Sequence, residues 1–551
     1  MPSSRESETH LIGAGGRKLC LALAAVFMAA AVAVAALPGS GSDESDAETA
    51  FDSEDGCFTF TVTDGSNVSV AAVSGVTLSG AVEIPETVTY NGVTYTVASV
   101  ADDGFKEQTS ITSVTIPDSV TSIGDSAFYH CSSLSDVTIP DGVTSIGGSA
   151  FYSCNKLTEV TLPDSLTSIG DAAFRLCLYL TSVTISDGVT SIGDHAFDFC
   201  TSLTSITIPD SVTSIGDYAF QNCSSATSLC IGSSVEEIGD YAFCQCVALT
   251  SVEIPGSVTS IGAHAFNYCT ALESIVIPDS VTTIGVSTFE ECYALESVTI
   301  PSSVTTIGDN AFYGCISLTE VTIPDSVTSI GDKAFAVCRA LESVTIPSSV
   351  TTIGDRAFCS CSSLESVIIP PSVTTIGDEA FASDDIYWLE EPTTLTEIAI
   401  PYVENMGTGV LDCTDLEIVY MDQEAFDEYS DVLGLPSSVT RYNYTYSITF
   451  DANGGTVDDS TGTAYYGVPF TPDQTPSRLG YVFTGWNTEA DGSGTAVTSG
   501  DAWTYYRSAD NTDITLYAQW ELDYVFLFAV LAGITISVTT AALTYHYRKS
   551  Q

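Results

Sequence analysis

Cysteine is the residue type whose spacing first suggests chemistry in this 551-residue chain. Eleven of the 17 cysteines recur every 23 residues, and each follows a phenylalanine by three positions. Such thiols could form disulfides or bind metal, but one small apolar side chain per repeat also suits a buried core. Neighbouring copies would present parallel Cα–Cβ vectors, which disfavours disulfides. We therefore expect a core column of thiols at Cys131, Cys154, Cys177, Cys200, Cys223, Cys246, Cys269, Cys292, Cys315, Cys338 and Cys361.

The other candidates for catalysis or metal binding are weak. The C-x-C segments Cys244–Cys246 and Cys359–Cys361 have no histidine near them, so they are a poor zinc signal. The chain has five histidines, and His130, His195 and His264 occupy repeat positions that vary. It contains no H-E-x-x-H motif and no phosphate-binding glycine loop. We therefore predict no catalytic residue, no metal site and no cofactor.

The charge balance excludes one class of partner. Asp and Glu number 70 against 14 Lys and Arg, for a net charge of −56. Phosphate contacts need clustered basic residues, so nucleic acid is excluded as a ligand. The acidity suits solubility and mutual repulsion at a cell surface or in a saline medium. Weak calcium binding stays open, although no dense acidic loop recurs with the repeat.

A 23-residue repeat positions all of these residues. The stretch Val114–Asp136 recurs in register to about residue 380, and its Phe marks every copy. A fixed period of this length means one supersecondary unit per copy, which buries its apolar face against its neighbours. The apolar content of 44% is enough for a continuous core. The sequence therefore predicts a solenoid.

Spacing inside one copy predicts its local structure. Apolar positions three apart, such as Phe128 and Cys131, favour a tight helical turn, whereas Val137–Ile139 reads as a short strand with both aliphatic side chains inward. The recurring glycine, as at Gly147, suggests either a positive φ or close passage of a neighbouring copy. Asp125 is expected to cap the turn that follows it.

Both ends of the chain carry long apolar runs. Residues 1–37 contain a basic pair and then Leu19–Leu37, which predicts a secretory signal or an N-terminal anchor. Tyr524–Tyr545 holds no charge and is long enough to cross a bilayer. Basic residues follow this second run and acidic residues precede it, so the tail 546–551 is expected in the cytoplasm and the repeats outside.

The repeats resemble the BspA-type leucine-rich repeats of microbial surface proteins. The segment VTIPDSVTSIGDSAFYHCSSL and its copies carry the resemblance over roughly residues 82 to 420. The resemblance implies a right-handed leucine-rich-repeat solenoid, and members of the family are commonly adhesins or surface binding proteins.

A second resemblance covers Tyr444–Trp520. The segments SITFDANGGTV, GYVFTGW and LYAQW resemble the Listeria–Bacteroides repeat, the B-repeat of internalin-type surface proteins. This family implies a small β-rich, β-grasp-like unit that often serves as a spacer. The expected organisation is a signal or anchor at 1–37, an acidic linker at 38–56, an N-terminal cap at 57–101, repeats at 102–381, last repeats and a cap with a helix at Gln423–Leu433 within 382–440, the module at 444–520, a transmembrane helix at 524–545 and the tail at 546–551.

The strand position between the two inward aliphatics is the candidate binding surface. It holds mostly Thr, which suits an exposed strand by propensity alone, but it becomes Cys230, Glu253 and Val276 in the middle of the repeats. With Glu236 and Glu237 nearby, this interruption predicts a binding patch. A regular Thr face could also bind ice or crystalline polysaccharide. The candidate ligand-binding residues are Glu236, Glu237, Glu253, Thr115, Thr138, Thr161, Thr184 and Thr207.

These features together predict a non-catalytic, adhesin-like surface protein. Its expected partner is a protein or glycan of a host or neighbouring cell, with the membrane as a second partner through the C-terminal helix. The alternative is a structural envelope component that self-associates with bridging cations. An enzyme concealed in the repeats ranks last, because no residue set marks one.

Overall fold

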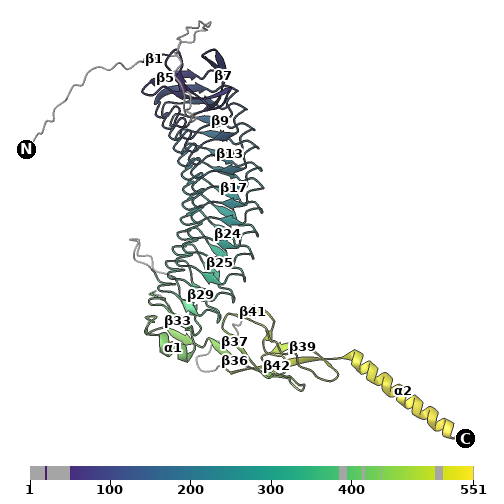
Figure 1. The fold of residues 1–551 in the computed structure, drawn as a ribbon. Helices are drawn as coiled ribbons and strands as arrows, with labels where there is room; N and C mark the ends of the chain where they lie inside the picture. Colours follow the sequence, from purple (N-terminus) through teal and green to yellow (C-terminus); the bar gives the residue numbers. More distant parts are fainter. Residues whose placement is uncertain are drawn as a thin grey trace, which may run out of the picture. The chain divides into compact units, whose positions relative to one another are not determined.

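Two compact units make up the part of the chain that the structure describes. The computed structural model describes residues 19–21, 50–383, 394–412, 416–435, 437–502 and 513–549. Unit 1 runs to Val304 and adds Gly308–Leu318, and unit 2 comprises Thr305–Ile307 and the chain from Thr319. Each unit contains stacked coils (Figure 1) in which each strand pairs in parallel with the strand 23 residues later, as Val114 with Val137. The predicted leucine-rich-repeat solenoid is confirmed.

Each coil contributes a long and a short strand, and we call the stacked sets the first and second strand rows. In unit 1 the first row contains β8 (Ser110–Thr115), β10 (Asp136–Thr138), β12 (Glu159–Thr161), β14 (Ser182–Thr184), β16 (Ser205–Thr207), β18 (Ser228–Cys230), β20 (Ser251–Glu253), β22 (Ser274–Val276) and β24 (Ser297–Thr299). The second row contains β9 (Ser122–Ile123), β11 (Ser145–Ile146), β13 (Ser168–Ile169), β15 (Ser191–Ile192), β17 (Ser214–Ile215), β19 (Glu237–Ile238), β21 (Ser260–Ile261) and β23 (Thr283–Ile284).

Unit 2 has two strand rows of the same kind, with the same strand lengths in its repeats. Its first-row strands are β26 (Glu320–Thr322), β28 (Ser343–Thr345), β30 (Ser366–Ile368), β32 (Glu397–Ala399), β34 (Ile418–Tyr420) and β35 (Thr440–Tyr442). Its second-row strands are β25 (Thr306–Ile307), β27 (Ser329–Ile330), β29 (Thr352–Ile353), β31 (Thr375–Ile376) and β33 (Asn405–Met406).

The N-terminal region pairs with both rows of unit 1. Strand β4 lies antiparallel to β3 and parallel to β7, and β7 pairs with β9, so this sheet continues into the second row. Strand β5 pairs with β8 of the first row and with β1. The expected export signal lies mostly outside the described residues and stays a prediction. The strands of this region are β1 (Leu19–Leu21), β2 (Ala50–Asp52), β3 (Phe58–Val62), β4 (Asn67–Ala72), β5 (Thr77–Glu83), β6 (Thr87–Tyr90) and β7 (Val93–Val100).

Phenylalanine and cysteine columns fill the core of the coils. Successive rings such as Phe128 and Phe151 stack almost parallel with centroids 5.2 Å apart. The repeat cysteines are buried in the core, as predicted. Thiols of this column also donate to a carbonyl of the preceding coil, as Cys154 Sγ does to Phe128 O at 3.3 Å. Burial raises the pKa of Cys177 to about 12, so this thiol stays protonated and unreactive at neutral pH.

Close passage, not positive φ, explains the glycine column. Neither Gly147 nor Gly216 has positive φ. A Cβ on Gly216 would lie 2.7 Å from the Asp194 backbone nitrogen of the preceding coil, well inside contact distance. Of the two explanations that the sequence left open, the positive φ is therefore wrong for these glycines.

The aspartate after the column glycine also joins coils, and the capping role expected for Asp125 is wrong. Its Oδ1 accepts the backbone N–H of Gly148 in the next coil at 2.7 Å. The same bond links Asp194 to Asp217 and Asp217 to Asp240, each at 2.8 Å. A run of turns, and not a helix, follows Asp125, so there is no helix N-terminus for it to cap. The backbone amide that needs a partner belongs instead to the next coil.

The last coils keep their register across an insertion. Val367 pairs with Ile398, as the spacing predicts, although residues 384–393 lie outside the described residues. Helix α1 (Gln423–Tyr429) ends before the expected Leu433, and Gly434 is left-handed beyond it. Strand β35 then pairs with β34 and ends the first row.

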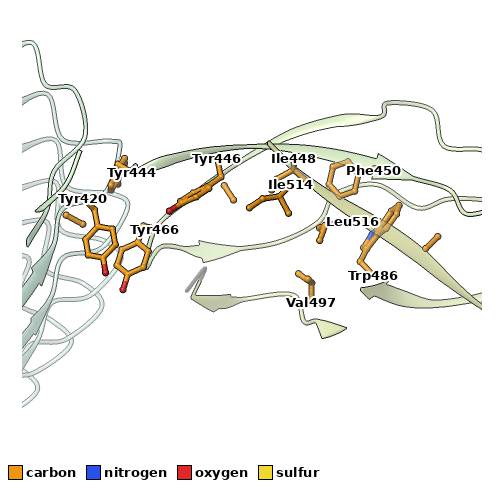
Figure 2. Close-up of a cluster of buried hydrophobic side chains, with 13 residues drawn as sticks. Tyr420, Tyr444, Tyr446, Ile448, Phe450, Tyr466, Trp486, Val497, Ile514 and Leu516 are labelled. Carbon is orange, nitrogen blue, oxygen red and sulfur yellow. The ribbon is translucent and has the colours of Figure 1, made fainter. Parts of the chain in front are cut away.

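The module is β-rich and packs on these last coils (Figure 2). Its main sheet has the order β37-β36-β42-β39-β40, with β36 and β42 parallel. Rings of Tyr420 and Tyr466 stack across the junction, and the Tyr444 hydroxyl donates to Ile369 O at 2.7 Å. The module thus shares a core with the last coils, and its role as a spacer stays a prediction. The strands are β36 (Thr445–Asp451), β37 (Thr461–Tyr465), β38 (Pro469–Phe470), β39 (Tyr481–Asn487), β40 (Ala496–Val497), β41 (Asp501–Ala502) and β42 (Asp513–Leu522).

Helix α2 (Tyr524–Lys549) follows β42. In the described part of the chain it is the one helix long and apolar enough to cross a membrane, over Tyr524–Thr544.

Candidate binding surface

The turn wall, meaning the residues of each coil between its column glycine and its next long strand, carries two left-handed positions per coil. His195 and Phe199 have φ of 56° and 58°. Their amides donate along the solenoid, to Asp217 O at 2.7 Å and to Gln221 O at 2.9 Å. Because these bonds use only backbone atoms, the side chains at both positions are free to vary between coils.

Four consecutive coils place an aromatic ring at the first left-handed position. His195 stacks on Tyr218 with centroids 4.5 Å apart, Tyr218 on Tyr241 at 4.7 Å, and Tyr241 on His264 at 4.3 Å. Interplanar angles of 4° to 9° make this one continuous stack, which we call the ring stack. The corresponding residues in the coils on either side are small: Ser126, Ser149, Ala172 and Ser287.

The second left-handed position adds a parallel column in the same four coils. It holds Phe199, Asn222, Gln245 and Tyr268, so aromatic groups stand at its ends and amides in its middle. Aromatic anchors beside polar groups that can adapt their hydrogen bonds are the composition of many protein-binding surfaces.

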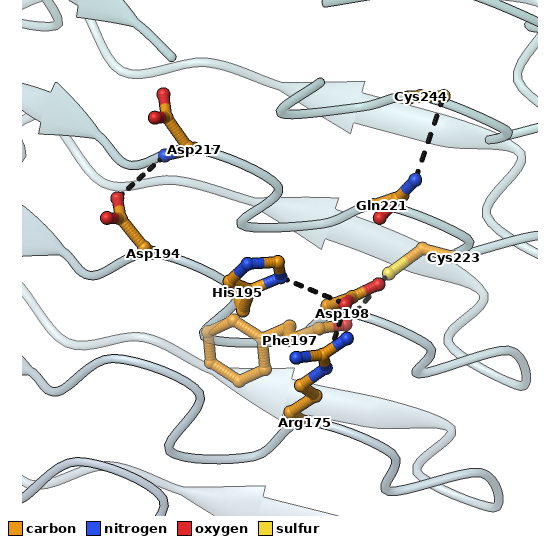
Figure 3. A network of polar contacts seen from close by, with 9 residues as sticks. All are labelled: Arg175, Asp194, His195, Phe197, Asp198, Asp217, Gln221, Cys223 and Cys244. Atoms are coloured by element: carbon orange, nitrogen blue, oxygen red, sulfur yellow. Dashed lines mark hydrogen bonds and ion pairs between the residues drawn. The ribbon is translucent and has the colours of Figure 1, made fainter. Parts of the chain in front are cut away.

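A buried polar cluster lies beneath the start of the ring stack (Figure 3). Asp198 is fully buried. Its Oδ2 lies 3.0 Å from Arg175 Nε and 3.1 Å from His195 Nδ1, so it joins the ring stack to a cation of the preceding coil. Burial raises the pKa of the Asp198 carboxyl, while His195 and Arg175 oppose that rise. The cluster fixes the orientation of the first ring.

The same row of positions continues under the other rings. Gln221 Nε2 lies 4.0 Å from Cys244 Sγ, which donates to Asn267 Oδ1 at 3.4 Å. Asn267 Nδ2 donates to Glu290 Oε2 at 3.0 Å, and that oxygen is 3.9 Å from His264 Nδ1. A histidine beside a carboxylate thus stands at each end of the ring stack.

The arrangement favours binding over catalysis. Burial raises the pKa of Cys244 to about 11, so the thiol beneath the stack is not an activated nucleophile. Within the described residues no group of three or more His, Cys, Asp or Glu side chains could hold a metal ion.

The predicted threonine column has the expected geometry. Thr115 pairs with Thr138 and Thr161 with Thr184, all exposed on the first strand row. After Thr207 the column continues in register through the predicted interruption and returns to threonine at Thr299. The residues of the interruption are Cys230, Glu253 and Val276, and Val276 is 60% exposed.

The predicted acidic patch is divided between the two rows. Glu253 ends β20 in the first row, whereas Glu237 opens β19 in the second, with Glu236 directly before it. All three are exposed. They share a region of the solenoid, but they do not form one contact cluster, and their role in binding stays a prediction.

Charge is unequally distributed around the coils. Up to Met406 every described Lys and Arg of the coils lies on the turn wall, and the strand rows carry carboxylates alone among charged groups, whereas the terminal strand β35 contains Arg441. A ligand of the strand rows would therefore meet negative charge, whereas the turn wall offers basic and neutral polar groups beside its carboxylates, such as Asp194 and Asp217. The basic residues are Lys106, Lys156, Arg175, Lys333, Arg339 and Arg356.

Sequence reasoning placed His195 and His264 at variable repeat positions but did not find the ring stack. The signal was present, because Tyr218 and Tyr241 fill the same position in the two copies between them. What was missing was the left-handed backbone, which no glycine marks and which turns this position outward.

Comparisons with known proteins match both regions. A family model described as the BspA type leucine-rich repeat region matches residues 98–223, 167–296 and 282–407, together more than half of the chain. A second model, the Listeria-Bacteroides repeat domain, matches residues 446–519.

Solved and curated relatives agree with these matches. A leucine-rich repeat protein from Bacteroides ovatus is 28% identical, covers 70% of this chain and 97% of its own length, and has a TM-score of 0.52. Two proteins of Evansella cellulosilytica that are named as membrane proteins are 37% identical over 101 residues and 34% identical over 143 residues. These stretches cover 17% and 24% of this chain, which spans only 11% and 19% of those relatives. The repeat family and fold are typical of non-catalytic protein interaction.

Proposed function

Because the chain belongs to the BspA-type leucine-rich repeat family, we propose that it is an adhesin-like surface protein that binds a protein or glycan of a host or neighbouring cell. Helix α2 would anchor it in a membrane with the repeats outside and residues 546–551 in the cytoplasm, following the positive charges after the helix.

The observation that carries the proposal is where the coils differ. The inward columns repeat with few exceptions, such as Ala226 and Thr288, whereas several outward columns change together in the coils between Asp198 and Glu290. On the first row Cys230, Glu253 and Val276 replace threonine. A solenoid needs only its inward columns to fold, so a local change of several outward columns supports a specific ligand there.

Binding of the full chain, in detergent or nanodiscs, to matrix proteins, mucins and glycans tests the proposal. A saturable ligand that persists at physiological salt is expected. The substitutions Glu236→Thr, Glu237→Ser and Glu253→Thr, which introduce the residues that most copies carry, should weaken binding at least tenfold. Glu320→Ser, on the same row in unit 2, is the matched control. Unchanged binding in the triple variant would remove these glutamates from the site, and the absence of any saturable ligand would contradict the proposal.

A further inference from the structure

The ring stack reads the same in both directions. Its order is His195, Tyr218, Tyr241, His264, so a reversed copy presents His, Tyr, Tyr, His again. A two-fold axis through the midpoint between Tyr218 and Tyr241 would place each histidine against the other histidine of a second copy.

The neighbouring columns follow the same symmetry. Reversal about that midpoint sets Phe199 against Tyr268, and Asn222 against Gln245, so aromatic groups meet aromatic groups and amides meet amides. At the positions that follow the column phenylalanines, where Asp198 and Asn267 lie beneath the rings, it sets the partly exposed Arg175 against the partly exposed Glu290, a cation against an anion.

We propose that two copies of this chain pair antiparallel through these turn walls, about a two-fold axis between the Tyr218 and Tyr241 coils. A parallel pair is disfavoured, because it would bring Arg175 to Arg175 and Glu290 to Glu290. The antiparallel pair forms the Arg175–Glu290 contact twice. The partner is thus a second copy, and the pairing names one ligand for the surface function proposed above.

The site suits self-association by a strongly acidic protein. Like molecules of net charge −56 repel, and the strand rows of unit 1 carry only carboxylates among charged groups. At the two ends of the ring stack the carboxylates of Asp198 and Glu290 already lie beside His195 and His264. The axis also sets Asp217 against Asp240, two exposed carboxylates that accept only backbone N–H groups, and this repulsion keeps the pairing weak. The rings are also held in order by stacking, so little side-chain entropy is lost when a partner binds. Their stacked faces are covered, which favours edge contacts with a protein over stacking on sugars.

The pairing is expected to be weak for isolated molecules. Coils advance by about 5 Å each, so the six coils from Arg175 to Glu290 present a strip about 25 Å long. Such a strip buries less than the roughly 1,200 Å² of a standard stable interface. Many copies held on one surface would raise the effective concentration and the avidity. Copies anchored on two facing surfaces would bring many such contacts together.

Cross-linking tests the orientation. Full-length chains carrying Cys230→Thr, to remove the exposed repeat thiol, receive either His195→Cys or His264→Cys and are treated with a short bismaleimide. A mixture of the two variants should give covalent dimers, whereas each variant alone should stay at the level of the Cys230→Thr parent. Covalent dimers formed by the His195→Cys variant alone would indicate a parallel pair instead of an antiparallel one. The absence of dimers in every sample would overturn the pairing.

Vesicle tethering tests the surface. Vesicles bearing the full chain should cluster without calcium, and Tyr218→Ser with Tyr241→Ser should reduce clustering at least tenfold. Serine occupies this position at Ser126 and Ser149, so the variant should fold. The control is Tyr129→Gln with Tyr152→Gln, another stacked pair whose column already contains Gln221.

If both variants lost clustering equally, or if neither lost it, the assignment of the pairing surface to the ring stack would be contradicted. Failure of clustering together with retained binding of a foreign ligand would remove self-pairing and leave the proposed surface function intact. Clustering that appears only with calcium would instead support the cation-bridged alternative.

Discussion

Two neighbouring groups of coils in unit 1 share a core and differ on the turn wall. The coils of Ser126, Ser149 and Ala172 and those from His195 to His264 bury the same phenylalanine and cysteine columns. At the first left-handed position the earlier group has small side chains and the later group has rings. The fold therefore constrains the inward columns and leaves this outward position open to selection by a ligand.

The largest expected effect comes from a position that both groups share. Gly216→Ala would place a Cβ 2.7 Å from the Asp194 nitrogen, and we expect a loss of about 3 kcal/mol in unfolding free energy. At Gly285 the nearest atom is the Thr288 hydroxyl at 3.2 Å, so Gly285→Ala should cost much less. Chemical denaturation of the two variants makes the comparison. Equal losses would mean that close passage is not what fixes the column.

The ring stack should matter less for stability than for pairing. Tyr218→Ser with Tyr241→Ser removes three ring contacts, each about 0.5–1 kcal/mol. Thermal unfolding should therefore show a moderate decrease, smaller than that of the glycine variant. A decrease as large as that of Gly216→Ala would place the rings among the residues that the fold requires and would break the comparison.

The Asp198 carboxyl should give the later coils a distinct pH dependence. Its pKa is raised in the folded state, so the folded chain holds this proton to higher pH than the unfolded chain does. Its contribution to stability is therefore present at acidic pH and falls as pH rises from 3.8 through the raised pKa. Asp198→Asn should lack this decline. Unfolding measured across acidic pH for both proteins checks it, and parallel curves would refute it.

The smallest effect concerns the aspartate that links coils. At Gly148 the sequence lacks it, and a Cβ there would meet nothing closer than Asp171 O at 3.5 Å. Gly148→Asp should let the new carboxylate accept the Asp171 N–H and raise the melting temperature by about 1 °C. Asp217→Ala, which removes an existing bond of this kind to Asp240, should lower it by a similar amount. Shifts of the same sign in both variants would show that the bond is not the cause.

Periodic features of the sequence predicted the architecture because each reports a requirement repeated in every coil. The Phe and Cys columns, the inward strand aliphatics at Val137 and Ile139, and the resumed register at Ile398 all follow from burial. The role of Asp125 was mispredicted, because its partner lies one coil away and local capping rules do not reach it. The ring stack was missed for a similar reason. The left-handed backbone at His195 depends on bonds to the next coil and leaves no glycine as a signal.

The thiol column also means that an opening of the coils can leave a lasting chemical change in the molecule. While the coils stay closed, Cys154 and its equivalents are protonated and shielded, and they cannot react with oxidants. A coil that opens releases a thiol of ordinary acidity next to others from the adjoining coils. Outside a cell, where disulfides persist, such an opening would be sealed by a non-native bond. The working life of the protein would then be set by how rarely its coils separate, and not by the equilibrium between folded and unfolded chains.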